Sequence, residues 1–258
     1  MELKMTGRKA LVTGGSLGIG RAIAHAFCGA GAEVAIVARR EDVLNQAKAE
    51  IEAATGGRIV TVPGDVSTAE GCEAAFNAAV SQLGQIDVLV NNAGSSHRAP
   101  FVDVTDAEWQ ADLDLKLFGA IRLCRLAFPG MTERKWGRII NVLNSGAKAP
   151  PPSGAPTAVT RAAGMALTKV LAGEGAPHNV LVNSLHVGKI ESDQWVRRAE
   201  KTGKDVRELY DEMGAELPMG RIGRAEEFAA AACFLASDAG SYICGAAINV
   251  DGGLSPVV

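Results

Sequence analysis

Hydrophobic residues occur along the chain as short, nearly continuous runs, separated by longer stretches in which apolar positions recur at helical spacing. Runs that are apolar throughout are typical of strands buried on both faces, as in a parallel sheet. Seven strands are predicted: Lys9–Val12, Glu33–Ala38, Ile59–Val62, Val88–Val90, Arg138–Val142, Val180–Leu185 and Ala247–Val250. Six helices are predicted between them: Ile19–Ala30, Glu41–Ala54, Thr68–Leu83, Asp106–Met131, Thr157–Gly175 and Ala225–Leu235.

This alternation predicts one α/β domain over residues 1–258, with a doubly wound, parallel seven-stranded sheet (a Rossmann fold) and helices on both faces. One segment departs from the alternation, a charged helical stretch over residues 191–216 between the sixth and seventh strands. An insert at the carboxyl end of a strand overhangs the edge where ligands bind in such sheets. We therefore expect residues 191–216 to form a substrate lid.

A glycine-rich turn, Thr13-Gly14-Gly15-Ser16-Leu17-Gly18-Ile19-Gly20, follows the first predicted strand and precedes a helix. In this context the motif binds a dinucleotide, because glycines let the backbone approach the pyrophosphate and the helix N-terminus meets its charge. The predicted contacts on this side of the cofactor are Gly14, Ser16, Leu17, Gly18, Ile19 and Gly20.

The end of the second strand indicates which dinucleotide is bound. A carboxylate about 20 residues beyond the glycine motif usually accepts the ribose hydroxyls of NAD. Here that position holds Ala38, followed by Arg39 and Arg40. Two guanidinium groups without a carboxylate favour the 2′-phosphate of NADP. NAD remains the alternative, as does a solvent-facing role for both arginines.

Further motifs follow in order over nearly the whole chain. They are Asp65-Val66, Asn91-Asn92-Ala93-Gly94, Pro218-Met219-Gly220-Arg221 and Asp251-Gly252-Gly253. Together with the glycine turn they make the chain resemble the short-chain dehydrogenase/reductase (SDR) family. The resemblance implies further cofactor contacts at Asp65, Val66, Asn92, Ala93, Gly94, Gly188, Ile190 and Ser192. Among these, Asp65 and Val66 would contact the adenine and Ser192 the nicotinamide carboxamide.

The same resemblance reveals substitutions at the four positions that carry the family's catalysis. Members of the family use Asn, Ser, Tyr and Lys; the tyrosine transfers a proton, and the lysine four residues later lowers its pKa. Aligned by spacing, Lys116 stands for the Asn, Asn144 for the Ser, Thr157 for the Tyr and Arg161 for the Lys. The chain thus resembles an atypical member that lacks the usual Asn-Ser-Tyr-Lys set.

These replacements change the expected chemistry. A threonine alcohol is far less acidic than a phenol, so Thr157 cannot supply the proton at neutral pH. Asn144 can donate a hydrogen bond to a carbonyl oxygen, and Arg161 can bind a cofactor ribose or an anionic oxygen. Lys116 adds a positive charge that the family lacks, which favours an anionic substrate or an oxyanion.

The proton donor remains open at this stage. His186 follows the sixth predicted strand, in a loop expected to cup the nicotinamide, and imidazole titrates in the right range. A structural histidine is the alternative. Lys116 with a depressed pKa is a second candidate donor. The chain's two tyrosines, Tyr210 and Tyr242, lie in the expected lid and just before the last strand.

Three functions follow as hypotheses. The first is an NADP-dependent oxidoreductase that acts on a carbonyl or alcohol group with a non-standard proton donor. The second is an NADP(H)-binding sensor or scaffold protein without turnover. The third is a non-redox lyase or isomerase that uses Lys116, Asn144 and Arg161 around an anionic intermediate.

Composition limits the partners and the cellular compartment that we expect. With a net charge of −3, the chain lacks the excess of basic residues that is typical of nucleic-acid-binding proteins. No apolar run reaches the roughly 18 residues of a membrane span. Five cysteines are scattered without CxxC spacing, so no metal site is expected and a reducing compartment is favoured. We expect a cytoplasmic protein that acts on a small molecule, and the resemblance implies a homotetramer or homodimer.

Overall fold

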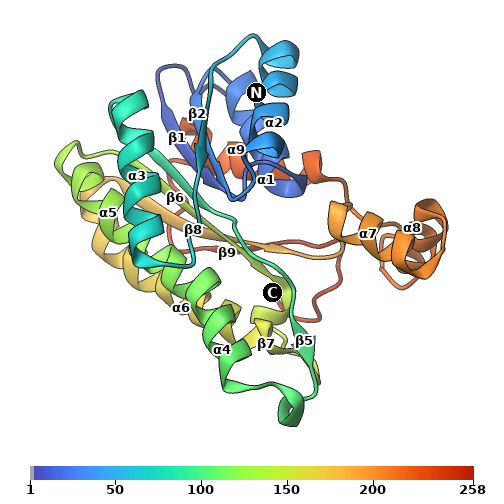
Figure 1. Ribbon diagram of the computed structural model, residues 1–258. Helices are drawn as coiled ribbons and strands as arrows, with labels where there is room; N and C mark the ends of the chain where they lie inside the picture. Colours follow the sequence, from blue (N-terminus) through green and yellow to red (C-terminus); the bar gives the residue numbers. More distant parts are fainter. Residues whose placement is uncertain (1–2) are drawn as a thin grey trace.

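A seven-stranded parallel sheet forms the centre of the protein, as a computed structural model of residues 3–258 shows (Figure 1). Its strands are β1 (Lys9–Thr13), β2 (Glu33–Ala38), β3 (Ile59–Pro63), β4 (Val88–Asn91), β6 (Gly137–Asn144), β8 (Val180–Val187) and β9 (Ala247–Val250). They lie in the order β3-β2-β1-β4-β6-β8-β9, so the winding reverses between β1 and β4. The predicted doubly wound fold is confirmed.

Helices cover both faces of the sheet (Figure 1). One layer contains α1 (Gly18–Gly29), α2 (Glu41–Thr55) and α9 (Ala225–Ala236); the other contains α3 (Ala69–Leu83), α5 (Gly119–Glu133) and α6 (Thr157–Gly175). Successive strand residues point to opposite faces, so Val12 packs into the first layer and Leu11 into the second. Burial on both sides explains the unbroken apolar runs. No helix within residues 3–258 has the length and hydropathy of a membrane span.

The single helix predicted over Asp106–Met131 is interrupted. α4 (Asp106–Leu113) runs into a π-helical turn, Asp114–Phe118, from which α5 begins. A π turn takes in an extra residue and shifts the phase of the side chains that follow it, often at functional sites. Here it places Lys116 in the protein interior.

Two strands run two residues further at their carboxyl ends than predicted. β6 reaches Asn144, and β8 reaches Val187, so His186 lies inside a strand and not in a loop. The prediction was wrong because pairing with Leu143 of β6 and Asn249 of β9 extends the ladder through His186. Two very short strands, β5 (Arg98–Ala99) and β7 (Ala155–Pro156), pair antiparallel at the same end of the sheet.

Residues 191–216 contain two helices, α7 (Asp193–Thr202) and α8 (Val206–Ala215), which project beyond the sheet in Figure 1. A hydrophobic cluster of their own holds them together, built from Ala199, Leu209, Met213, Leu217 and Ile222. Their role as a lid stays a prediction.

The core of the first layer makes a testable contribution to stability. Phe27 of α1 is 0% exposed, whereas Phe101 is 73% exposed. We expect Phe27→Ala to lower the free energy of unfolding by about 3–5 kcal/mol, because it leaves a cavity. The matched variant Phe101→Ala should stay within about 0.5 kcal/mol of the parent. Urea denaturation followed by circular dichroism measures both, and equal losses would contradict the placement of Phe27 in the core.

Candidate active site

The site opens where β1 and β4 diverge, and a set of hydrogen bonds fixes this opening. The Thr13 hydroxyl accepts hydrogen bonds from the backbone N–H groups of Asn92 and Ala93, each at 3.0 Å. In return, the Asn92 amide donates to the carbonyl oxygens of Thr13 at 2.8 Å and Gly14 at 3.3 Å. The glycine turn is thereby held against the loop that follows β4.

The glycine turn has the shape that an anion requires. Gly14 and Gly18 have φ values of +64° and +53°, which favour glycine. A Cβ on Gly20 would overlap the carbonyl oxygen of Gly14. No side chain caps α1, so none competes for the N–H groups of its first turn. These residues fit the pyrophosphate of a dinucleotide.

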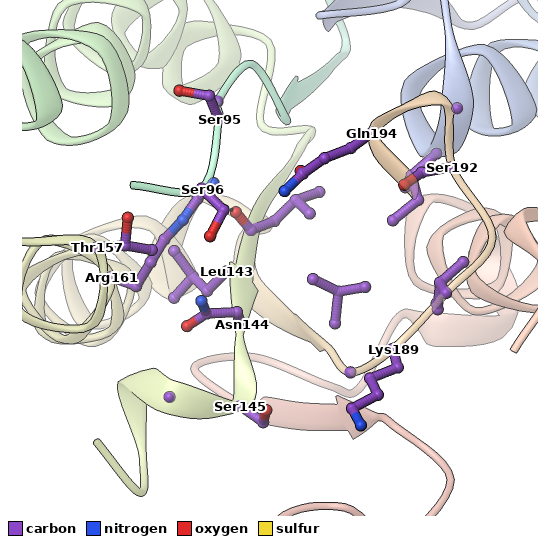
Figure 2. Close-up of a pocket in the computed structure, with 18 of the residues that line it drawn as sticks. Ser95, Ser96, Leu143, Asn144, Ser145, Thr157, Arg161, Lys189, Ser192 and Gln194 are labelled. Atoms are coloured by element: carbon purple, nitrogen blue, oxygen red, sulfur yellow. Dashed lines mark hydrogen bonds between the residues drawn. The ribbon is translucent and has the colours of Figure 1, made fainter. Parts of the chain in front are cut away.

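A cavity of about 700 Å³ extends from this turn along the carboxyl ends of β4, β6 and β8 to α7 (Figure 2). The predicted residues that line it are Gly14, Leu17, Gly18, Ile19, Gly20, Asn92, Ala93, Gly94, Asn144, Thr157, Arg161, Gly188, Ile190 and Ser192. The structure therefore brings one end of the predicted cofactor site together with three of the catalytic candidates.

Other predicted residues lie outside the cavity lining: Ser16, Arg39, Arg40, Asp65, Val66, Lys116 and His186. Arg39 and Arg40 follow β2, and Asp65 follows β3, where the adenosine half of a dinucleotide is expected. The backbone N–H of Ser67 lowers the pKa of Asp65, and the charge of Arg39 acts in the same direction. Arg39 and Asp65 thus lie close enough to share one binding region.

Arg161 brings a half-buried positive charge to the cavity wall. Its Nη1 donates to the carbonyl oxygen of Val142 at 2.6 Å, and a Cβ on Gly94 would lie only 2.5 Å from its Nη2. Its Nε is buried without a partner in the described chain. Burial lowers the pKa of Arg161 to about 10, so the group stays charged at neutral pH. Such a donor fits a ribose hydroxyl or an anionic oxygen.

Asn144 ends β6 and lies at the cavity beside Leu143 (Figure 2). Its Oδ1 is buried and has no partner within residues 3–258. The side chain therefore presents an unsatisfied acceptor beside the cavity.

The Thr157 hydroxyl is fully engaged inside the protein. It accepts hydrogen bonds from Lys116 Nζ at 2.8 Å and from the N–H of His97 at 3.0 Å, and it donates to the carbonyl oxygen of His97 at 2.7 Å. A hydroxyl offers one donor and two acceptor positions, so none remains for a substrate. Figure 2 shows the oxygen directed away from Asn144. Thr157 therefore anchors the 92–99 loop in place of supplying an acid.

Lys116 lies in the π turn and forms an ion pair with Asp112. The two side chains are 1% and 4% exposed. Burial lowers the pKa of Lys116 to about 8, although the hydrogen bond to Asp112 opposes this shift. Asp112 therefore offsets the extra positive charge that the sequence predicts. Sequence reasoning missed Asp112, although its i, i+4 spacing from Lys116 is a usable signal.

His186 is fully buried and does not line the cavity. Its Nδ1 donates to the carbonyl oxygen of Asn144 at 3.1 Å, and its Nε2 lies 3.0 Å from Ser184 Oγ. Burial lowers the pKa of His186 to about 4, so the ring is neutral at pH 7. This placement argues against His186 as the proton donor and indicates that it holds the end of β6.

The cavity wall carries an excess of positive charge from other residues. Arg98 of β5, Lys189 and Arg197 of α7 line it together with Arg161, while Lys189 is paired with Glu216. No Asp or Glu whose side chain is described lines the cavity. Further lining residues that sequence reasoning did not assign to a site are Ser95, Ser96 and Gln194. Arg98 was missed because β5 exists only through its pairing with distant β7.

Comparison with known proteins defines the class. A family model described as enoyl-(acyl carrier protein) reductase matches residues 14–255. The chain belongs to the short-chain dehydrogenase/reductase family.

Individual relatives match over nearly their whole length. A 3-oxoacyl-[acyl-carrier-protein] reductase of Aquifex aeolicus is 33% identical, over 98% of this chain and 100% of the relative. An acetoacetyl-CoA reductase of Shinella zoogloeoides is 36% identical, over 95% of this chain and 98% of the relative. The crystal structure of L-sorbose reductase from Gluconobacter frateurii, complexed with NADPH and L-sorbose, superposes with a TM-score of 0.95 at 34% identity and covers 100% of both chains.

The burial of His186 predicts a specific pH dependence of stability. Its pKa is about 4 in the folded protein against an ordinary value of 6.5. As the pH falls from 6.5 toward 4, the unfolded chain binds a proton at this position and the folded protein does not, so stability is lost. Between pH 7 and pH 4, the free energy of unfolding of the wild type should fall by about 3 kcal/mol more than that of His186→Gln. Denaturation curves between pH 7 and pH 4 test this, and parallel profiles for the two proteins would contradict it.

Proposed function

We propose that the protein is an NADP-dependent oxidoreductase that interconverts a carbonyl and an alcohol on a small molecule. The supporting observation is the single cavity that joins the glycine turn to Asn144 and Arg161. The named reductases among its relatives, including the L-sorbose reductase bound to NADPH, support the same activity.

The residues present fit the dinucleotide at both ends. Arg39 and Arg40, without a carboxylate at Ala38, favour the 2′-phosphate of NADP. Near the reacting end, Arg161 would bind the ribose and Ser192 the carboxamide. When bound, the dinucleotide supplies or accepts the hydride.

Asn144 and Arg161 carry the remaining chemistry in this proposal. The Asn144 amide donates to the substrate oxygen, and the Arg161 guanidinium stabilises the negative charge that develops there, because a fixed cation acts strongly in a desolvated site. The proton then comes from water, since the Thr157 hydroxyl is engaged and His186 lies away from the cavity. Lys116 donates to Asp112 and Thr157, so it is not the direct donor.

One observation favours a second candidate, an NADP(H)-binding sensor or scaffold. The engaged Thr157 hydroxyl leaves the site without an acid in the position where the family has its tyrosine. The third hypothesis, a lyase or isomerase, would also use Asn144 and Arg161 but without any net change in the redox state of the dinucleotide. Turnover decides between the three functions.

We further propose that the substrate carries an anionic group. Arg98 and Arg197 line the cavity, both are exposed, and neither forms an ion pair with a described carboxylate. Unpaired guanidinium groups are suited to carboxylate or phosphate recognition.

Cofactor choice provides the first test. Calorimetric titration should show tighter binding of NADPH than of NADH. Arg39→Asp should weaken NADPH binding by about tenfold or more, as expected for the loss of a charge-assisted contact. Arg125→Asp, at an exposed position of α5, makes the same charge change away from the site and should have no effect. Equal affinity of the wild type for both dinucleotides would contradict the assignment to NADP.

Turnover with matched substrates provides the second test. Wild-type protein should oxidise NADPH with 4-formylbenzoate at a higher kcat/KM than with the neutral 4-formylbenzamide. We expect Arg98→Gln and Arg197→Gln each to reduce this preference by up to about fivefold, because exposed ion pairs contribute up to about 1 kcal/mol.

Arg207→Gln on α8 serves as the matched control and should keep the preference. A preference for the amide would contradict an anionic substrate. Tight NADPH binding without product from any carbonyl would instead support the sensor or scaffold.

A further inference from the structure

Two of the four departures from the family's catalytic set touch each other. Lys116 Nζ donates to Thr157 Oγ1 at 2.8 Å, and Thr157 in turn holds both backbone polar groups of His97. The π turn, the start of α6 and the loop after β4 are therefore joined through one lysine.

A third departure, Arg161, lies against the same glycine as this lysine. A Cβ placed on Gly94 would be 2.5 Å from Arg161 Nη2 and 3.5 Å from Lys116 Cγ. The Lys116 stem and the Arg161 guanidinium thus both lie against Gly94, in the loop that carries the cofactor motif. Close like charges destabilise each other, and Arg161 is one of the groups that lower the pKa of Lys116.

One buried carboxylate, that of Asp112, interacts with both Lys116 and Arg161. Asp112 Oδ1 binds Lys116, while Asp112 Oδ2 is buried without a partner in the described chain. The charge of Asp112 also acts on Arg161. Of the helices packed against the π turn, α4 contributes Asp112 and α6 contributes Arg161; no charged group of α5 within the described chain acts on Lys116.

We propose that Lys116 is a positioning residue: by neutralising Asp112 it keeps Arg161 directed at the cavity, and loss of its proton lets Asp112 draw Arg161 away. The same loss weakens the hold of Lys116 on Thr157 and thereby on the loop at His97. The proposal rests on the proposed function, because Arg161 is the proposed ribose contact.

The relevant pH range follows from the burial of the pair. Lys116 has a pKa of about 8, and Arg161 keeps its charge up to about 10. Between these values Asp112 is a buried anion without its lysine partner, which is strongly unfavourable. Arg161 is the cation beside it, and Oδ2 is a free acceptor. Dinucleotide binding should therefore weaken as the pH rises through about 8.

NADPH fluorescence titration of the whole protein tests this, since NADPH is stable in alkali. For the wild type, Kd should rise about tenfold from pH 7 to pH 9.5, the equivalent of one lost charge-assisted contact. Lys116→Met should bind weakly at both pH values, because Asp112 then competes for Arg161 throughout. The double variant Lys116→Met/Asp112→Leu should regain the affinity of the wild type at pH 7 and keep it at pH 9.5.

The double variant separates this role from a purely structural one. Loss of the Lys116–Thr157 bond is common to both variants, so recovery in the double variant reports only the competition for Arg161. Lys135→Gln, at an exposed position at the other end of the sheet, controls for lost positive charge and should behave as wild type. Circular dichroism confirms that each variant is folded. A flat wild-type profile, or a double variant as weak as Lys116→Met, would overturn the proposal.

A readout without dinucleotide distinguishes failure of this proposal from failure of the proposed function. The amide chemical shift of Gly94 should move with an inflection near pH 8 in the wild type and stay flat in the double variant. An inflection without NADPH binding would reject the function and retain the role of Lys116. NADPH binding without an inflection would reject the role of Lys116 alone.

Discussion

The reciprocal hydrogen bonding between Thr13 and Asn92 is the contact on which the rest of the site depends. It joins the carboxyl ends of β1 and β4 at the point where the winding of the sheet reverses. At such a point the two following loops diverge and leave a crevice. Without a crosslink the glycine turn and the 92–99 loop would be free to adjust separately. The crosslink gives both loops one fixed geometry, against which Arg161 and Asn144 can be positioned.

Three of the four substituted catalytic positions form a connected set. Lys116, Thr157 and Arg161 are linked directly or through Gly94, and Asp112 supplies the counter-charge. A buried lysine without a carboxylate is strongly unfavourable, so Lys116 and Asp112 depend on each other.

The fold could be predicted from the sequence because strands that are buried on both faces of a parallel sheet are apolar at almost every position. Family membership followed from motifs in a fixed order. The π turn could not be predicted, because an extra residue in one helical turn leaves the apolar spacing almost unchanged. The length of β8 depended on pairing with β9, a contact between distant segments, and so His186 was placed in the wrong environment.

Within the site, residue identity was easier to predict than charge balance. Arg161 and Asn144 could be located by counting from neighbouring motifs, and the cavity contains both. The effect of Lys116 depended on its partner, which is a property of three-dimensional proximity. The single-domain organisation, the lid and the assembly into dimers or tetramers stay predictions.

The separate hydrophobic cluster of α7 and α8 has a consequence for how this scaffold diversifies. Ala199, Leu209 and Met213 pack with neighbours in their own cluster and not with the two layers that flank the sheet. Sequence changes in this pair of helices therefore leave the main core intact. α7, which lines part of the cavity, can therefore change in sequence while the dinucleotide-binding half of the molecule stays the same.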